Sequence, residues 1–210
     1  PACGSGAFPM GMLQVMLGVY EKIEPNFNAK QAKLNIIKNN LHGVDIEPLA
    51  VEISRLRAWL SILVEDSEKI DPLPNLDFKF ICADALIPLD NSGYGRLLDD
   101  RELEENISKI RSDYYEEISY DNKMSLRQEY EKYLGTLLNG DQTAFSNRQK
   151  QLLSYHPFDI AKTASFFDPQ FMFGVDKFEI VIGNPPYVST KGTTESYKSR
   201  LKSVYKFADD

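Results

Sequence analysis

The nine residues from Ile180 to Val188 constrain the fold more than any other part of the sequence. They read IVIGNPPYV. The first three are β-branched and apolar, which is typical of a buried strand. Pro185 and Pro186 cannot donate a hydrogen bond to a sheet ladder, so a strand cannot continue through them. The sequence therefore predicts a core strand that stops at Gly183, followed by an amide, a rigid carbonyl and an aromatic ring.

Two further predicted strands end near an aspartate. The run LHGVDIEP predicts a short strand that ends near Asp45. The run FKFICADAL predicts another that ends near Asp84, with Phe78, Phe80 and Cys82 on one side of it. Because helical patterns separate the strands, we expect a mostly parallel sheet with helices on both faces. In such sheets ligands bind beyond the carboxyl ends of the strands.

The spacing of apolar residues predicts which helix faces pack in the core. A glycine-rich turn, PACGSG, precedes a helix with Pro9 in its first turn, where the missing N–H costs little. Residues 29–40 predict a second helix, and a third begins at Pro48. The predicted core positions recur at helical spacing: Phe8, Met12, Met16 and Val19 in the first helix, and Leu49, Ile53, Leu56, Leu60 and Leu63 in the third.

From about Asn91 the pattern changes to two long amphipathic helices, separated by the breaker SYDNK. Their apolar positions are Leu103, Ile107, Ile110, Tyr114 and Ile118, then Leu126, Tyr130, Tyr133 and Leu137. We expect an antiparallel helical hairpin, packed on the domain as an insertion with charged outer faces. Return connections follow, FFDPQFMFG reads as a turn, and the polar tail from Val188 predicts a loop that leads into a helix. The predicted units are residues 1–93, 94–165 and 166–210.

The composition is that of an ordinary globular protein, with 42% hydrophobic and 26% charged residues. No apolar run approaches the length of a membrane span, and the two cysteines lack metal-ligand spacing. We therefore expect a reduced, cytoplasmic protein without a metal site or a membrane. His42 and His156 are isolated in the sequence, and we expect structural roles for both.

The net charge of −7 argues against a dedicated nucleic-acid-binding protein, but the charge is uneven. Residues 99–132 hold eleven acidic and six basic side chains. Residues 188–207 hold five basic side chains and one acidic one. The average charge therefore conceals a basic end.

Three short motifs hold candidate ligand-binding groups. Gly4 and Gly6 at the start of a helix let the backbone approach a ligand closely. The alternative is that the turn only caps the helix. Asp45 can accept hydrogen bonds from ribose hydroxyls or act as the N-cap of the helix at Pro48. Asp84 can accept from an exocyclic amine, such as that of adenine, or act as a cap or turn residue. Together they suggest a nucleoside-bearing cofactor without a site for a phosphate chain.

The order PACGSG, GVDIEP, CADAL and IVIGNPPYV resembles the N6-adenine-specific DNA methyltransferases. It is most similar to the large type IIG restriction–modification enzymes and related phage-defence methyltransferases, over essentially the whole chain. The resemblance implies an α/β, Rossmann-like fold dependent on S-adenosylmethionine, and double-stranded DNA as the partner of a longer parent protein. In that family, a strand and an acidic residue precede the proline that corresponds to Pro1. We therefore expect an internal fragment that lacks the first strand, binds the cofactor poorly and self-associates through an open sheet edge.

The resemblance also implies roles for individual residues. The turn would cradle the cofactor, Asp45 and Ile46 would hold its ribose and adenine ring, and Asp84 and Leu86 would contact its adenine. Asn184 and the carbonyl of Pro185 would accept hydrogen bonds from the target amine, and Tyr187 would stack on the target base. The implied catalytic residues are Asn184, Pro185, Pro186 and Tyr187, and the implied cofactor-binding residues are Ala2, Cys3, Gly4, Gly6, Asp45, Ile46, Asp84 and Leu86.

Other functions stay open on the sequence. A protein-glutamine N5-methyltransferase uses a similar NPPY run, but it is shorter between its third-strand acidic motif and that run, whereas Asp84 and Asn184 are 100 residues apart in this chain. An N4-cytosine methyltransferase is a near variant, though it more often has serine at the position of Asn184. An inactive scaffold that uses the helical hairpin as a docking surface is the third alternative.

Overall fold

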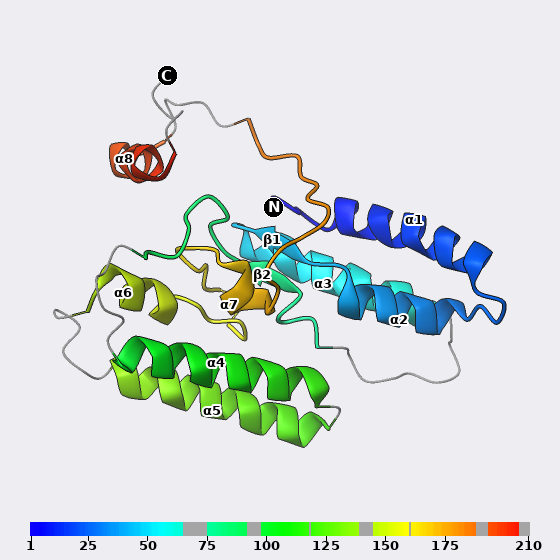
Figure 1. The fold of residues 1–210 in the computed structure, drawn as a ribbon, viewed down its shortest axis with the longest axis horizontal. Coiled ribbons are helices and arrows are strands. Elements are labelled where there is room, and N and C mark those ends of the chain that lie inside the picture. The colour runs from blue at the N-terminus through cyan, green and yellow to red at the C-terminus, as the bar shows by residue number, and fades with distance from the viewer. Residues whose placement is uncertain are drawn as a thin grey trace.

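The computed structural model describes residues 1–64, 75–91, 98–117, 119–138, 145–159, 161–187 and 193–205. These residues form helices around a small parallel sheet (Figure 1). The elements are α1 (Ala7–Ile23), α2 (Ala29–Asn39), β1 (Gly43–Asp45), α3 (Pro48–Leu63), β2 (Phe80–Cys82), α4 (Leu98–Glu116), α5 (Tyr120–Leu138), α6 (Asn147–Leu153), α7 (Pro169–Phe173) and α8 (Glu195–Val204).

Strands β1 and β2 pair in parallel, as the alternation of strands and helices predicts. Val44 lies opposite Ile81 and Asp45 opposite Cys82 in the register. The amide of Cys3 donates to the carbonyl of Val44 over 3.0 Å, so the N-terminal segment lies along the other edge of β1. The carboxyl ends of both strands and the glycine-rich turn therefore meet at one end of the sheet.

The two faces of the sheet bury different cores. Phe80 packs in a cluster with residues of α1, α2 and α3. Its neighbours Ile81 and Ala83 pack in a second cluster, together with residues of α4 to α7. This alternation follows from the two-residue period of a strand, and it confirms that helices cover both faces. Phe78, predicted on the same side as Phe80, instead joins the second cluster, because it lies in a turn before the strand begins.

The buried face of α3 differs from the predicted one. The face that carries the small residues Ser54 and Ala58 is buried. The apolar stripe predicted for the core is largely exposed, and the exposed fraction is 71% for Leu49 and 49% for Leu56. The reason is close packing against the glycine-rich turn, since a Cβ at Gly6 would lie 3.0 Å from the Oγ of Ser54. Only a small side chain fits there. The buried residues of α3 are Val51, Ser54, Ala58 and Ile62.

The predicted face of α1 is also only partly correct. Met12 and Met16 pack against the first cluster, but Phe8 is 42% exposed and Val19 is 51% exposed. The fully buried position on this helix is Leu13. Because α1 is apolar on most of its circumference, spacing alone does not indicate which side faces the sheet.

Helices α4 and α5 form the predicted antiparallel hairpin, which lies beside the sheet in Figure 1. Asn106 donates to Tyr133 near one end of the pair, and Arg127 donates to Tyr114 near the other. Ile107, Ile110 and Tyr130 are buried, as predicted. The side chains of Leu103, Ile118 and Leu137, which belong to the same prediction, lie outside the described residues.

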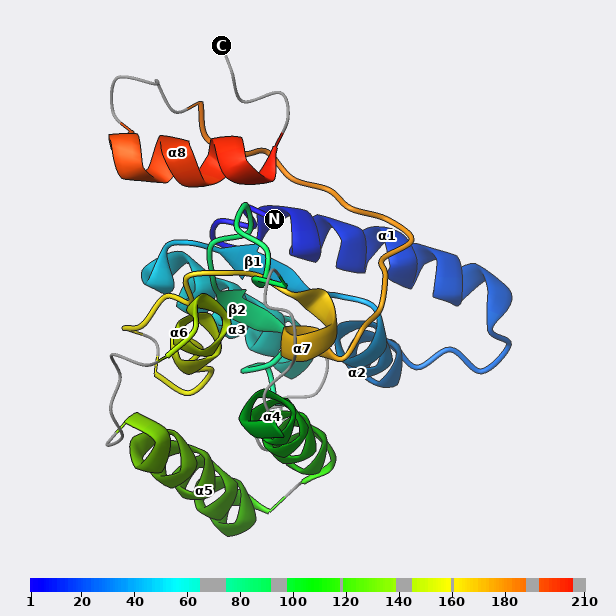
Figure 2. The ribbon, with the colours of Figure 1, turned by 60° about the vertical axis from the view of Figure 1, so that its left-hand side comes forward.

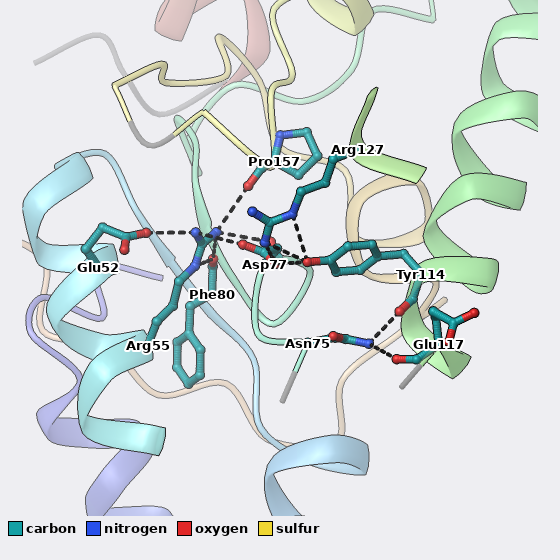
Figure 3. A network of polar contacts seen from close by, with 9 residues as sticks. All are labelled: Glu52, Arg55, Asn75, Asp77, Phe80, Tyr114, Glu117, Arg127 and Pro157. Atoms are coloured by element: carbon teal, nitrogen blue, oxygen red, sulfur yellow. Dashed lines mark hydrogen bonds and ion pairs between the residues drawn. The ribbon is translucent and has the colours of Figure 1, made fainter. Parts of the chain in front are cut away.

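A polar network joins the hairpin to the rest of the domain (Figure 3). The carboxylate of Asp77 accepts hydrogen bonds from Tyr114 at 2.7 Å, from Arg127 at 3.0 Å and from Arg55 at 3.3 Å. Arg55 also donates to the carbonyl of Phe80 at the start of β2. These side chains come from α3, α4, α5 and the turn before β2, so the network anchors the insertion to the sheet.

Three segments of the C-terminal half depart from the predicted elements. Residues Ile180–Gly183 are extended but form no strand, and Ile180, Val181 and Ile182 are 68%, 66% and 42% exposed. A strand needs a ladder partner, and the strand pairing in the described part of the chain involves only β1 and β2. Helices α6 and α7 occupy segments predicted as connections and a turn. A capping box at Ser146 and an N-cap at Asp168 begin them.

Helix α8 confirms the helix predicted in the polar tail, while the loop before it lies mostly outside the described residues. Within the described ranges, every helix is too short or too polar to cross a membrane.

Candidate functional site

The glycine-rich turn and the end of β1 are joined through Asp45. One carboxylate oxygen of Asp45 accepts a hydrogen bond from the amide of Gly4 at 2.7 Å, and the other accepts from the amide of Glu47 at 3.0 Å. The N-cap of α3 is Glu47, not Asp45, so the capping alternative is wrong. Asp45 instead ties the turn to the loop after β1.

The backbone of the turn has conformations that favour a close approach by a ligand. Gly4 and Gly6 have φ angles of 55° and 85°, which L side chains rarely adopt. Ala2 also has a positive φ of 48°, and such strain in a non-glycine residue occurs often at ligand sites. The turn is therefore both the cap of α1 and a backbone cradle beside Asp45.

Two residues of α3 that the sequence did not indicate as site residues donate hydrogen bonds to the turn. Ser54 is fully buried in α3, and its hydroxyl donates to the carbonyl of Gly4 at 2.9 Å. Arg57 donates to the carbonyl of Ser5 at 3.0 Å. Together with Asp45, they fix both sides of the Gly4 peptide. The sequence signal for Ser54 was the four-residue spacing of the small residues Ser54 and Ala58 in α3. The leucine stripe was the stronger pattern and favoured the other face of the helix.

Asp84 follows β2 and is only 8% exposed. One of its carboxylate oxygens accepts from the amide of Leu86 at 3.1 Å and from the hydroxyl of Tyr197 at 3.2 Å. The first contact fits the turn role that the sequence left open. Ile46 and Leu86 follow the two neighbouring strands and are 52% and 51% exposed. Two apolar side chains thus lie at the strand ends without full burial.

Both cysteines lie near this end of the sheet, and neither is an activated nucleophile. Burial, and then the carboxylate of Asp45, raise the pKa of Cys3 to about 11. Burial also raises the pKa of Cys82, whose sulfur lies 3.2 Å from the Oγ1 of Thr163. A thiol reacts as its thiolate, so both side chains stay unreactive at neutral pH.

The segment that contains the NPPY run passes beside the N-terminal turn. A Cβ placed at Gly183 would lie 2.6 Å from the carbonyl oxygen of Pro1, which only a glycine tolerates. Asn184, Pro185 and Pro186 follow and are exposed, and Tyr187 is fully exposed. The structure thus brings Gly183, which directly precedes the NPPY run, against Pro1 at the start of the glycine-rich segment, although 182 positions separate the two residues.

Helix α8 lies over the same end of the sheet, and Figure 2 shows it above the N-terminus and the loop after β2. Tyr197 contacts Asp84, Arg200 donates to the carbonyl of Ser165 at 3.3 Å, and Tyr205 donates to the carbonyl of Leu86 at 2.9 Å. Helix α8, which contains Lys198, Arg200 and Lys202, therefore lies on the side of the molecule that holds the predicted site.

The two histidines lie away from these groups. His42 packs against the rings of Phe173 and Phe178, and its Nε2 lies 2.9 Å from the Nζ of Lys79. Burial, and then the charge of Lys79, lower the pKa of His42 to about 3. Burial also lowers the pKa of His156. The environment of His42 fits the structural role expected for it.

Comparison with known proteins identifies one family. The model of the Eco57I restriction-modification methylase family matches residues 39–210. A putative type II restriction enzyme and methyltransferase from Methanocaldococcus jannaschii is 36% identical over 96 residues, which cover 41% of this chain. The matched segment spans only 8% of that relative. No solved structure matches the chain.

Proposed function

Because the chain belongs to the Eco57I restriction-modification methylase family, we propose that it forms part of the catalytic domain of a DNA methyltransferase. The reaction is methyl transfer from S-adenosylmethionine to N6 of adenine in double-stranded DNA. The observation that carries this proposal is the adjacency of the NPPY run and the glycine-rich turn, seen in the approach of Gly183 to Pro1. A methyl donor on the turn would lie next to an acceptor held by NPPY.

The residues at the strand ends fit a nucleoside-bearing cofactor. Gly4 offers an open backbone with a positive φ, Gly6 packs its positive-φ backbone against Ser54, and Asp45 hydrogen-bonds to both the turn and the loop after β1. Half-exposed Ile46 and Leu86 are apolar surfaces suited to the two faces of an adenine ring. In this proposal, Ala2 and Cys3 complete the turn. Asp84 accepts from the adenine amine, and the parallel sheet is the core of a Rossmann-like methyltransferase fold.

The NPPY run fits the chemistry of an amine acceptor. An exocyclic amine is a weak nucleophile because its lone pair is delocalised into the ring. The side-chain oxygen of Asn184 and the carbonyl oxygen of Pro185 accept hydrogen bonds from the two N–H groups of this amine. They favour a nitrogen with a localised lone pair, and these preorganised dipoles stabilise the transition state. Pro186 holds that carbonyl in a rigid backbone. The cofactor supplies an activated methyl group, so positioning supplies much of the rate.

The target base must leave the duplex to reach these groups. Tyr187 is fully exposed and free to stack on it, which offsets the cost of unstacking by roughly 1–3 kcal/mol. Lys198 and Arg200 of α8 lie near this end of the sheet and add positive charge for the phosphate backbone. In this proposal, residues 94–165 form a separate insertion between a cofactor-binding unit (1–93) and a catalytic unit (166–210).

The exposed segment at Ile180–Ile182 also supports self-association. An extended apolar segment without a ladder partner is a template for pairing with another chain. We expect the isolated chain to form dimers or larger species in light scattering. A monodisperse monomer at high concentration would argue against such pairing.

The test of the function is methyl transfer by the parent protein that contains this chain. Labelled S-adenosylmethionine and duplex DNA should yield N6-methyladenine, identified by mass spectrometry after digestion to nucleosides. Asn184→Ala should abolish the product without changing cofactor binding. Transfer to protein alone would favour the glutamine methyltransferase, N4-methylcytosine the cytosine variant, and no transfer a scaffold role.

A further inference from the structure

Helix α8 contacts the two residues of the loop after β2 that the proposed function assigns to the cofactor's adenine. The hydroxyl of Tyr197 lies 3.2 Å from a carboxylate oxygen of Asp84, and the hydroxyl of Tyr205 donates to the carbonyl of Leu86 at 2.9 Å. These two contacts come from opposite ends of the helix. Helix α8 therefore spans this loop rather than touching it at one point (Figure 2).

The burial pattern shows what the helix covers. Asp84 is 8% exposed, whereas Leu86 on the same loop and Ile46 on the loop after β1 are about half exposed. Tyr197 and Leu201 pack against the core cluster beside Asp84. A ligand that approaches between Ile46 and Leu86 therefore finds apolar surface available, but it meets Tyr197 at the carboxylate.

The contact made by Tyr197 has the same chemistry as the one proposed for the cofactor. A phenol O–H and an exocyclic amine N–H are both donors to a carboxylate. Burial, and then the charge of Asp84, raise the pKa of Tyr197 to about 12, so the hydroxyl stays protonated and remains a donor at neutral pH. The amide of Leu86 and the hydroxyl of Tyr197 both donate to the same oxygen of Asp84, so an amine that donates to this oxygen must displace the hydroxyl.

The remaining hold on α8 is light. None of its residues is buried, Tyr197 and Leu201 pack only partly on the core cluster, and Arg200 adds a long hydrogen bond of 3.3 Å to the carbonyl of Ser165. Segments with few buried apolar contacts open at low free-energy cost. The helix can therefore leave the strand ends at the cost of these hydrogen bonds and of the partial packing of Tyr197 and Leu201 on the core cluster.

We propose that α8 is a lid over the adenine end of the cofactor site and that Tyr197 is its latch, with a hydroxyl that competes with the adenine amine for Asp84. The proposal rests on the assignment of Asp84 to the cofactor. It predicts that the lid opens when S-adenosylmethionine binds and that loss of the latch hydroxyl strengthens binding.

The first test is titration of the parent protein that contains this chain with S-adenosylmethionine by calorimetry. Tyr197→Phe removes the latch hydroxyl and keeps the ring that packs on the core, so binding should tighten by about 10-fold to 150-fold, the effect of one hydrogen bond to a charged group. Ser203→Ala is the matched control on the same helix, because its hydroxyl only donates to the carbonyl of Arg200. Equal affinity of Tyr197→Phe and the wild type would overturn the latch.

The second test is limited trypsin digestion, which cuts after Lys198, Arg200 and Lys202 in α8. An opening lid predicts faster cleavage at these sites in the presence of S-adenosylmethionine. Tyr197→Phe should show faster cleavage even without the cofactor. Slower cleavage in the presence of the cofactor would mean that α8 closes on the ligand instead, and it would overturn the proposal.

A failure of the proposed function would look different from a failure of the lid. If neither the wild type nor Tyr197→Phe binds S-adenosylmethionine at millimolar concentration, the assignment of the cofactor site is wrong, and the lid is wrong with it. If both bind equally, and Asp45→Ala abolishes binding in both, the site stands and only the lid is overturned.

Discussion

Gly183 lies so close to Pro1 that a Cβ on Gly183 would be 2.6 Å from the carbonyl oxygen of Pro1. This contact joins the two segments that the proposed reaction needs side by side. Real Cβ atoms do not approach a backbone oxygen so closely, so any larger residue at 183 must push the two segments apart. The spacing between the turn and the NPPY run therefore depends on a glycine.

Gly183→Ala should separate the NPPY run from the glycine-rich turn. We expect methyl transfer by the parent protein to fall by about 10²-fold, the scale of a misplacement near 1 Å, with little change in cofactor affinity. Gly18→Ala is the control, because a Cβ at that position in α1 meets nothing within 4 Å. It should stabilise the fold by about 0.5–1 kcal/mol. A Gly183→Ala protein with unchanged turnover would show that the contact does not set the spacing.

Ser54→Ala should loosen the turn. The substitution leaves the carbonyl of Gly4 without its donor, which costs about 1–3 kcal/mol in the free energy of unfolding, and it should weaken S-adenosylmethionine binding. Ser61→Ala on the same helix is the control, since its hydroxyl donates only to the carbonyl of Ala58 one turn earlier. Chemical denaturation and calorimetry measure the two effects. Similar losses from both variants would point to a general effect on α3.

Asp77→Ala should detach the hairpin from the sheet. It removes the acceptor of Tyr114 and one of the two carboxylates that pair with Arg55, which keeps Glu52 at 2.8 Å. Leaving the hydroxyl of Tyr114 without this acceptor costs about 1–3 kcal/mol. Hydrogen exchange should show α4 and α5 exchanging faster. Asp159→Ala is the control, because the ion pair of Asp159 with Lys162 is exposed and worth at most about 1 kcal/mol. Equal exchange in the two variants would contradict the anchoring role.

Stability should fall as the pH drops below about 6.5, partly because of His42. Its pKa is about 3 in the folded chain and near 6.5 when unfolded. The unfolded chain therefore binds more protons between these values, and acidification favours it. From pH 7.5 to 5.5 the loss from this residue is about 1 kcal/mol. His42→Gln should flatten the unfolding free energy over this range. A profile as steep as that of the wild type would show that other groups cause the loss.

The sequence alone determined the local elements at the strand ends. The strands that end at Asp45 and Asp84 depend on the strand propensity of short apolar runs. The turn before α1 depends on helix capping and on the backbone freedom of its glycines. The parallel pairing of the strands, the hairpin and the glycine-rich turn were predictable for this reason. The order of the motifs also indicated a restriction–modification methyltransferase, which the family match confirms. The site roles, the cofactor and the cytoplasmic location stay predictions.

Only the tertiary structure decided which faces and segments meet. The leucine stripe of α3 and the small face around Ser54 both fit a helix, and close approach to Gly6 selected the small face. The run at Ile180–Ile182 has the composition of a strand, yet it forms no strand, because strand formation depends on a partner rather than on the segment itself. The contacts between Gly183 and Pro1 and between Tyr197 and Asp84 join residues more than 100 positions apart, and no local pattern encodes such a distance.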